Sequence, residues 1–153
     1  MKRVFAGAFA LLSVLSLEAR GSEDVISKGY SVFESKCASC HPVSVPPEKL
    51  KKIREVVKKG GKPPIKAPPM EEISARVKKF YPDEESFVRF VSDYITNPSQ
   101  DKGVCMPMAY KVFGVMPPVG RGMSEEEKEA VARWLYRNFH YTWEEFIEKH
   151  PHH

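Results

Sequence analysis

Cysteine is scarce in this chain, which holds three cysteines among 153 residues. An odd number of cysteines cannot all pair within one molecule, so a full disulfide framework is excluded as the basis of the fold. A structural zinc site takes four ligands that usually come in pairs. Cys37 and Cys40 form one Cys-x-x-Cys pair and no second such pair exists, so the sequence also argues against a zinc module.

Several other features are missing after residue 21. The remaining chain of about 130 residues has no internal repeat, no low-complexity tract and no long apolar run, and its length suits one domain. The formal net charge is only +4, which does not favour binding to nucleic acid. Strand-like alternation of apolar and polar residues is absent as well, so we predict an all-α fold.

The first residues have the pattern of an export signal. Lys2 and Arg3 precede an apolar run over residues 4–17, and small residues follow at 19–21. Fourteen apolar residues are fewer than the roughly 20 that a membrane-spanning helix needs. We therefore predict a signal peptide over residues 1–21 and an exported, periplasmic protein. The alternative is an uncleaved anchor, which would leave the protein associated with the membrane.

Helical periodicity is present in four segments after the signal. Prolines end or precede several of these segments. The last helix has the clearest start, because Ser124 followed by Glu127 has the pattern of a capping box. The four segments are residues 24–37, residues 70–80, residues 84–95 and the helix that follows Ser124.

Two long connections separate these helices within a predicted domain of residues 22–140. Residues 42–66 form a basic insert that contains a short helix and is flanked by proline pairs. Residues 97–123 form a loop with little periodicity that contains Cys105, Met106, Met108 and Met116. A loop of that length in a compact domain is usually functional or disordered, and these four sulfur-bearing side chains favour a function. Residues 141–153 are predicted to be a C-terminal extension.

The motif Cys37-Ala38-Ser39-Cys40-His41 carries the chemistry of the chain. A thioredoxin-like redox pair needs a strand before its first cysteine, whereas the segment before Cys37 is helical. Two thiols at this spacing can form thioethers with the two vinyl groups of a porphyrin, and the adjacent histidine can then bind the iron. The motif therefore predicts one covalently attached haem c, with His41 as an axial ligand.

The residues around the motif point to one family. Gly29 lies eight residues and Phe33 four residues before Cys37, and the last helix carries Trp134. In these features the chain resembles the class I monohaem cytochromes c. In that family the glycine lets the first and last helices cross closely, and the phenylalanine packs beside the haem. The resemblance implies a small cytochrome c fold, with crossed N- and C-terminal helices around a covalently bound haem.

The resemblance extends over most of the chain. "APPM" at residues 67–70 is similar to a family segment whose proline carbonyl holds the proximal histidine, which gives Pro68 that role. "VSDYITNP" is similar to the family's third helix and its exit, and residues 114–139 are similar to its Met-Pro ligand loop and final helix. Arg76, shortly after Pro68, is a candidate partner of a haem propionate. The basic insert and Cys105 depart from the family pattern.

The second axial ligand must come from a methionine if the resemblance holds. We choose Met116, because a thioether favours ferrous iron and the two following prolines stiffen the loop that presents the sulfur. Met106 and Met108 stay open as alternatives, since they flank another proline. We expect Met70 and Met123 to fill the core.

Cys105 allows three interpretations. It can be a small buried apolar residue, as free cysteines commonly are. It can form an intermolecular disulfide in an oxidising compartment. It can also be a reactive or iron-binding thiolate beside the haem, and the protein would then be the haem domain or subunit of an enzyme that oxidises sulfur compounds.

Charged residues gather in two further places. The basic insert holds only two glutamates against eight cations, so it is either a solvated face or a docking surface for an acidic partner. The tail histidines could bind a divalent metal or belong to a frayed end. The cations of the insert are Lys49, Lys51, Lys52, Arg54, Lys58, Lys59, Lys62 and Lys66, and the histidines are His150, His152 and His153.

Together these features predict an exported, monomeric, single-haem cytochrome c that carries one electron at a time and transforms no substrate. Its partners are expected to be respiratory redox proteins: a membrane oxidoreductase or oxidase, or a periplasmic dehydrogenase.

Overall fold

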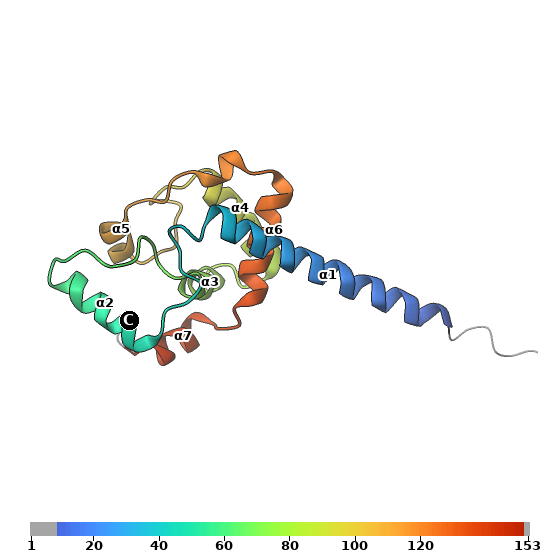
Figure 1. The fold of residues 1–153 in the computed structure, drawn as a ribbon, viewed down its shortest axis with the longest axis horizontal. Helices are drawn as coiled ribbons and strands as arrows, with labels where there is room; N and C mark the ends of the chain where they lie inside the picture. Colours follow the sequence, from blue (N-terminus) through green and yellow to red (C-terminus); the bar gives the residue numbers. More distant parts are fainter. Residues whose placement is uncertain (1–8, 152–153) are drawn as a thin grey trace, which may run out of the picture.

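The computed structural model describes the backbone of residues 9–151 and the side chains of residues 23–151. Within residues 9–151 the chain forms seven α-helices, one 3₁₀ turn and no strand, which confirms the all-α prediction (Figure 1). The elements are α1 (Phe9–Lys36), α2 (Pro47–Lys58), α3 (Met70–Lys78), α4 (Glu84–Thr96), α5 (Pro107–Phe113), η1 (Val119–Gly122), α6 (Glu125–Asn138) and α7 (Trp143–Lys149).

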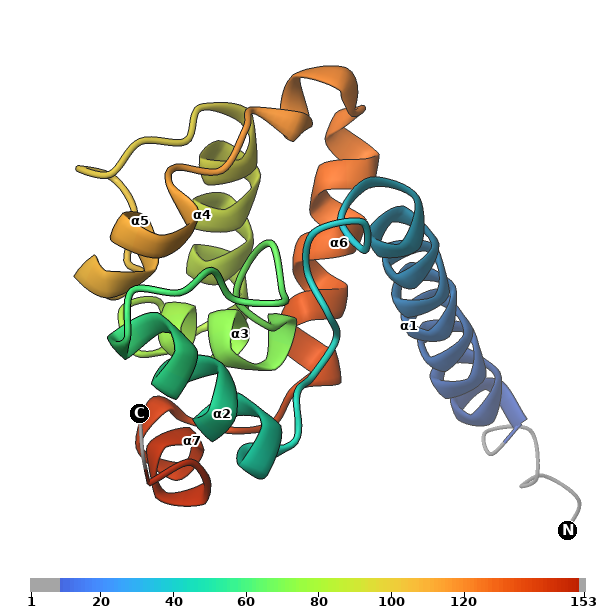
Figure 2. The same ribbon diagram turned by 60° about the vertical axis from the view of Figure 1, so that its left-hand side comes forward.

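The crossing of α1 with α6 is the centre of the fold (Figure 2). Gly29 of α1 lies directly against α6, and a Cβ atom there would overlap the carbonyl oxygen of Ala130 and the Cβ of Trp134. One turn further on, the ring of Phe33 stacks on Trp134 with 4.7 Å between ring centroids. The predicted crossing of the first and last helices of the domain is therefore confirmed.

We expect Gly29→Val to lower the thermal unfolding midpoint. Its side chain would overlap backbone as well as side-chain atoms of α6, so the two helices would have to separate, at a cost of roughly 1–3 kcal/mol or more. Gly122→Ala is the matched control, because a Cβ at that position meets no atom within 4 Å. We expect it to change stability by less than about 0.5 kcal/mol. Equal midpoints for the two variants would contradict a close crossing at Gly29.

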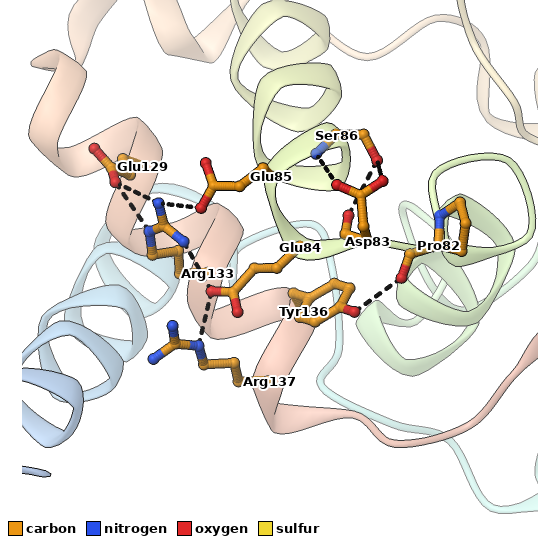
Figure 3. A network of polar contacts seen from close by, with 9 residues as sticks. All are labelled: Pro82, Asp83, Glu84, Glu85, Ser86, Glu129, Arg133, Tyr136 and Arg137. Carbon is orange, nitrogen blue, oxygen red and sulfur yellow. Dashed lines mark hydrogen bonds and ion pairs between the residues drawn. The ribbon is translucent and has the colours of Figure 1, made fainter.

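A network of ion pairs joins α4 to α6 (Figure 3). The guanidinium of Arg133 reaches Glu84 and Glu85 of α4 and Glu129 of its own helix, each at 2.9 Å. Arg137 donates to the same Glu84 carboxylate at 2.7 Å. Arg133 and Glu84 are largely shielded from solvent, so this network stabilises the helix pair more than isolated surface pairs would.

Hydrogen bonds at the helix ends match the sequence patterns. Ser124 and Glu127 form the predicted capping box at the start of α6, and Asp83 accepts from the backbone N–H of Ser86 at the start of α4. A second capping box, between Thr142 and Glu145, begins α7.

The helices enclose two apolar clusters. The larger combines residues of α1, α3, α4 and α6, and it buries Met70 and Met123 as expected. The smaller lies between α2, α3 and α7. Its members are Val45, Leu50, Ile53, Ala75, Trp143 and Phe146.

Two predictions about the connections need correction. The loop of residues 97–123 is not free of regular structure, because it contains α5 and η1. The described part of the predicted extension is not a frayed end, because it contains α7. His150 is buried there, with Nδ1 at 2.8 Å from the carbonyl oxygen of Phe146, and is not a solvated tail residue. His152 and His153 lie outside the described residues.

The predicted signal peptide is described only in part. Residues 1–8 lie outside the described range, and residues 9–21 continue α1 as helix. This N-terminal part of α1 extends away from the other helices (Figures 1 and 2). Among the described residues, no helix combines the length and apolar character needed to cross a bilayer.

Candidate functional site

The Cys-x-x-Cys-His motif begins where α1 ends. The backbone turns at once, with the N–H groups of Cys40 and His41 donating to the carbonyl of Cys37 at 3.1 and 3.0 Å. Cys40 is exposed and Cys37 is partly buried, and none of the described cysteines forms a disulfide. Burial, with a smaller contribution from Cys40, raises the pKa of Cys37 to about 11. Neither side chain is used in a disulfide, so both sulfur atoms are available for attachment.

The imidazole of His41 is held in one orientation. Its Nδ1 lies 2.8 Å from the carbonyl oxygen of Pro68, and the side chain is buried. A carbonyl can only accept, so Nδ1 carries the proton and Nε2 keeps its lone pair for a metal. Burial lowers the pKa of His41, and the bond to Pro68 opposes this only in part. The neutral, ligating form of the imidazole is favoured.

The first turn of α3 holds the chain that follows His41. The N–H of Met70 donates to Pro42, and the N–H of Glu71 donates to Val43, at 2.9 and 3.0 Å. These two N–H groups belong to the first turn of α3, which has no partner for them within the helix. These bonds join the backbone just after His41 to the start of α3, which directly follows Pro68 and Pro69. The Pro68 carbonyl is thereby kept close to the His41 ring.

One cavity brings the predicted haem residues together. Its lining includes Cys37, Cys40, His41, Pro68 and Met116. Its remaining walls are mainly apolar and come from five helices and the loops between them, with Ile73, Val77, Phe90, Val91, Ile95, Val131, Trp134 and Leu135 among them.

The donor set of this cavity fits a haem. Among the described residues no group of three or more His, Cys, Asp or Glu side chains could hold a bare metal ion. The lining offers the imidazole of His41, the thioethers of Met70 and Met116, and the thiols of Cys37, Cys40 and Cys105. An imidazole and a thioether can complete the coordination of an iron held by a porphyrin, and the two thiols of the motif can attach the ring. Apolar walls match the body of the ring.

The three candidate methionines differ in position. Met116 is half-buried and lines the cavity together with His41. Met106 and Met108 are 38% and 56% exposed and are not among the described residues of the lining. The structure brings only the first of the three into the same cavity as the histidine.

Cys105 also lines the cavity, beside the α5 residue Tyr110. Burial raises the pKa of Cys105. A thiol with a raised pKa is a poor nucleophile, so its surroundings do not favour the sulfur-oxidising alternative. No sequence pattern pointed to Tyr110, although Pro107 is a common signal for the start of a helix such as α5.

Arg76, the candidate partner of a haem propionate, contacts two aromatic rings and a backbone carbonyl. Its guanidinium lies over the rings of Phe80 and Trp143, 4.9 and 4.8 Å from their centroids, and its Nε donates to the carbonyl of Val104 at 2.8 Å. It is absent from the described lining of the cavity, whose cationic members are Lys36 and Lys66. Arg76 therefore packs against Trp143 of α7 and donates to Val104, a residue of the cavity lining, and its contact with a haem propionate stays a prediction.

Comparison with known proteins agrees with this site. The family model described as "Cytochrome C oxidase, cbb3-type, subunit III" matches residues 24–135. A protein of Aquifex aeolicus (strain VF5), described as an uncharacterized protein, is 58% identical to this chain over 126 residues. The matched region covers 82% of this chain and 83% of the Aquifex protein. No solved structure matches the chain. The chain therefore belongs to the cytochrome c family that this model describes, which gives it a haem-binding domain and a role in electron transfer.

Proposed function

We propose that this protein is an exported cytochrome c that carries one electron at a time on a single covalently bound haem. In this proposal Cys37 and Cys40 form the thioethers, and His41 and Met116 are the axial ligands. The observation that carries it is the cavity that these four residues share, with the His41 ring already oriented by Pro68.

Each part of the chain has a separate task in this function. When bound, the haem supplies an iron that changes its charge by one electron. The hydrogen bond from His41 to Pro68 keeps the imidazole oriented and strengthens its basicity. The apolar walls keep water from the site, so little solvent has to reorganise when the charge changes. A neutral thioether at Met116 favours the ferrous state and therefore a higher reduction potential.

Covalent attachment is the first test of this function. We expect the haem to remain with the polypeptide through acid-acetone extraction and denaturing electrophoresis, because thioether bonds survive both treatments. The variant Cys37→Ala/Cys40→Ala should lose the haem under the same conditions. Cys105→Ala is the matched control and should keep it. A haem that leaves the unaltered protein cleanly would exclude the thioether assignment.

Export can be tested on the same preparation. We expect the mature protein from the periplasmic fraction to begin near Ser22, because the small residues before it suit a signal peptidase. Mass spectrometry of the intact protein would measure this. A full-length chain found in the membrane fraction would favour the uncleaved anchor.

We further propose that the partner is a redox protein with an acidic docking surface. The lysines of α2 and the following loop are all exposed, and no ion pair among the described residues includes them. Leu50 and Ile53 on the other face of α2 are buried, which turns the lysines toward solvent. Lys36 and Lys66 line the cavity, so positive charge extends to the proposed haem site. A membrane oxidase or a periplasmic dehydrogenase with an acidic surface would suit this arrangement.

A further inference from the structure

Helix α7 lies beyond the part of the chain that the family model matches, which ends at residue 135. It is nevertheless firmly packed. Trp143 and Phe146 are only 4% and 1% exposed, whereas Ile147 on the opposite face is 37% exposed. Because α7 has a capping box at its start and buries two aromatic residues, it is an integral part of the fold.

The cluster around α7 combines a residue of α3 with residues of the segment that joins His41 to Pro68. Besides Pro69, residues 42–69 contain four buried apolar residues, of which three belong to the α7 cluster and none belongs to the main core. These three are Val45, Leu50 and Ile53. The only other buried member besides the two aromatic residues is Ala75 of α3. Trp143 and Phe146 are the two largest buried side chains of this cluster, so α7 supplies most of the apolar surface against which the three residues pack.

Polar contacts connect α7 to α3 and, through Glu71, to the segment that follows His41. Lys149 lies 3.5 Å from the carboxylate of Glu71, whose own N–H holds the carbonyl of Val43. Lys79 and Glu144 form a second pair at 3.1 Å. Such pairs are weak where they are exposed, so the buried aromatic residues must supply most of the hold.

Two backbone hydrogen bonds from α3 hold the start of this segment, whereas its last part has no regular structure. After α2 it passes through Gly60, whose φ of +77° is in the left-handed region, and then through residues 61–69, which lack helix and strand. The hydrogen bond from His41 depends on where this segment places the Pro68 carbonyl.

We propose that α7 is a brace for the proximal histidine: by packing Trp143 and Phe146 against α2 and Val45, it keeps the Pro68 carbonyl in place as the acceptor of the His41 ring. Trp143 and Phe146 are positioning residues and do not touch the cavity. The inference rests on the proposed role of His41 as an iron ligand. A loosened brace lets Pro68 move away, and the His41 Nδ1 proton then exchanges with water.

The test uses the full-length, haem-loaded protein and the variants Trp143→Ala and Phe146→Ala. NMR would follow the solvent exchange of the His41 Nδ1 proton and of the backbone N–H groups of Met70 and Glu71. We expect all three to exchange at least about tenfold faster in both variants, because local opening near the deleted ring becomes easier. The N–H groups at the α1–α6 crossing should keep their rates within about twofold.

Ile147→Ala is the matched control, since it removes a side chain from the exposed face of the same helix. It should leave every rate unchanged, and Trp143→Phe should restore most of the protection lost in Trp143→Ala. If an alanine variant fails to load haem, Phe146→Leu provides a milder change. We expect the His41, Met70 and Glu71 protons to exchange faster in it than in the unaltered protein, with the rates at the α1–α6 crossing unchanged. Unchanged exchange at His41, or equal acceleration at the α1–α6 crossing, would overturn the brace.

Failure of the brace and failure of the haem assignment give different results. If His41 does not bind the iron, its Nδ1 proton shows no hyperfine shift even in the unaltered ferric protein. The exchange of the Met70 and Glu71 N–H groups would still report whether α7 holds the segment.

Discussion

Met116→Ala is expected to lower the reduction potential and to open the iron to external ligands. Loss of the thioether removes its preference for ferrous iron, so the potential should fall by on the order of tenths of a volt, within the roughly 0.8 V that axial ligands span. The reduced variant should bind carbon monoxide readily, whereas the unaltered protein should not. Potentiometric titration would measure the potential. Loss of the absorption band that reports iron–methionine ligation in the oxidised protein would show that the coordination position is open.

Met106→Ala and Met108→Ala are the matched controls, because both side chains are exposed and outside the described cavity lining. We expect their spectra and potentials to equal those of the unaltered protein, with stability changed by less than about 0.5 kcal/mol. The opposite pattern, with the band surviving in Met116→Ala and disappearing in Met108→Ala, would move the ligand to the Met106–Met108 segment. Cys105, which directly precedes that segment, would then have to be reconsidered as a reactive group.

The parts of the fold that were predicted from the sequence depend on local signals. The capping box at Ser124 acts over three residues, and it sets the start of α6 regardless of what packs around it. The crossing at Gly29 and Trp134 was inferred from the family resemblance, and the overlap that a Cβ would produce gives its physical reason. The ring of His41 could be placed beside Pro68 for the same reason, since the resemblance included both positions.

The parts that were missed depend on contacts between distant residues. The Thr142–Glu145 capping box is a local signal for α7, but nothing local shows that Trp143 packs against residues 90 or more positions earlier in α2. Helix α5 has no buried residue, so it produces no apolar stripe by which it could be recognised. The surroundings of Arg76 were missed for the same reason. A sequence does not reveal that an arginine is enclosed by two aromatic rings from different elements.

The candidate site combines both kinds of information. The spacing of Cys37, Cys40 and His41 indicates the cofactor without any knowledge of the fold, because the chemistry of attachment requires that spacing. The choice among the methionines does not follow from spacing alone, since two of the candidates adjoin a proline in a similar way. The cavity supports Met116, because that side chain shares it with His41.

Reversal of four charges on the basic insert is expected to slow electron transfer to the physiological partner by one to three orders of magnitude at low ionic strength. The variant replaces Lys51, Lys52, Lys58 and Lys59 by glutamate, which changes the formal net charge of the full chain from +4 to −4. An attractive field speeds the encounter with an acidic surface by about 10- to 1000-fold, and this advantage is lost when the sign is reversed. Stopped-flow measurement of the transfer rate at several salt concentrations would show the effect.

The matched control replaces the same four lysines by arginine, which keeps the charge at every position. Its rate and its salt dependence should follow those of the unaltered protein, because long-range steering depends on charge more than on the identity of the cation. The glutamate variant should speed up with added salt, since screening now weakens a repulsion. All four altered lysines are exposed, so the haem spectrum and the thermal midpoint should stay the same in both variants. A glutamate variant that reacts as fast as the arginine variant at low salt would show that the partner docks elsewhere, and the exposed lysines would then be a solvated face.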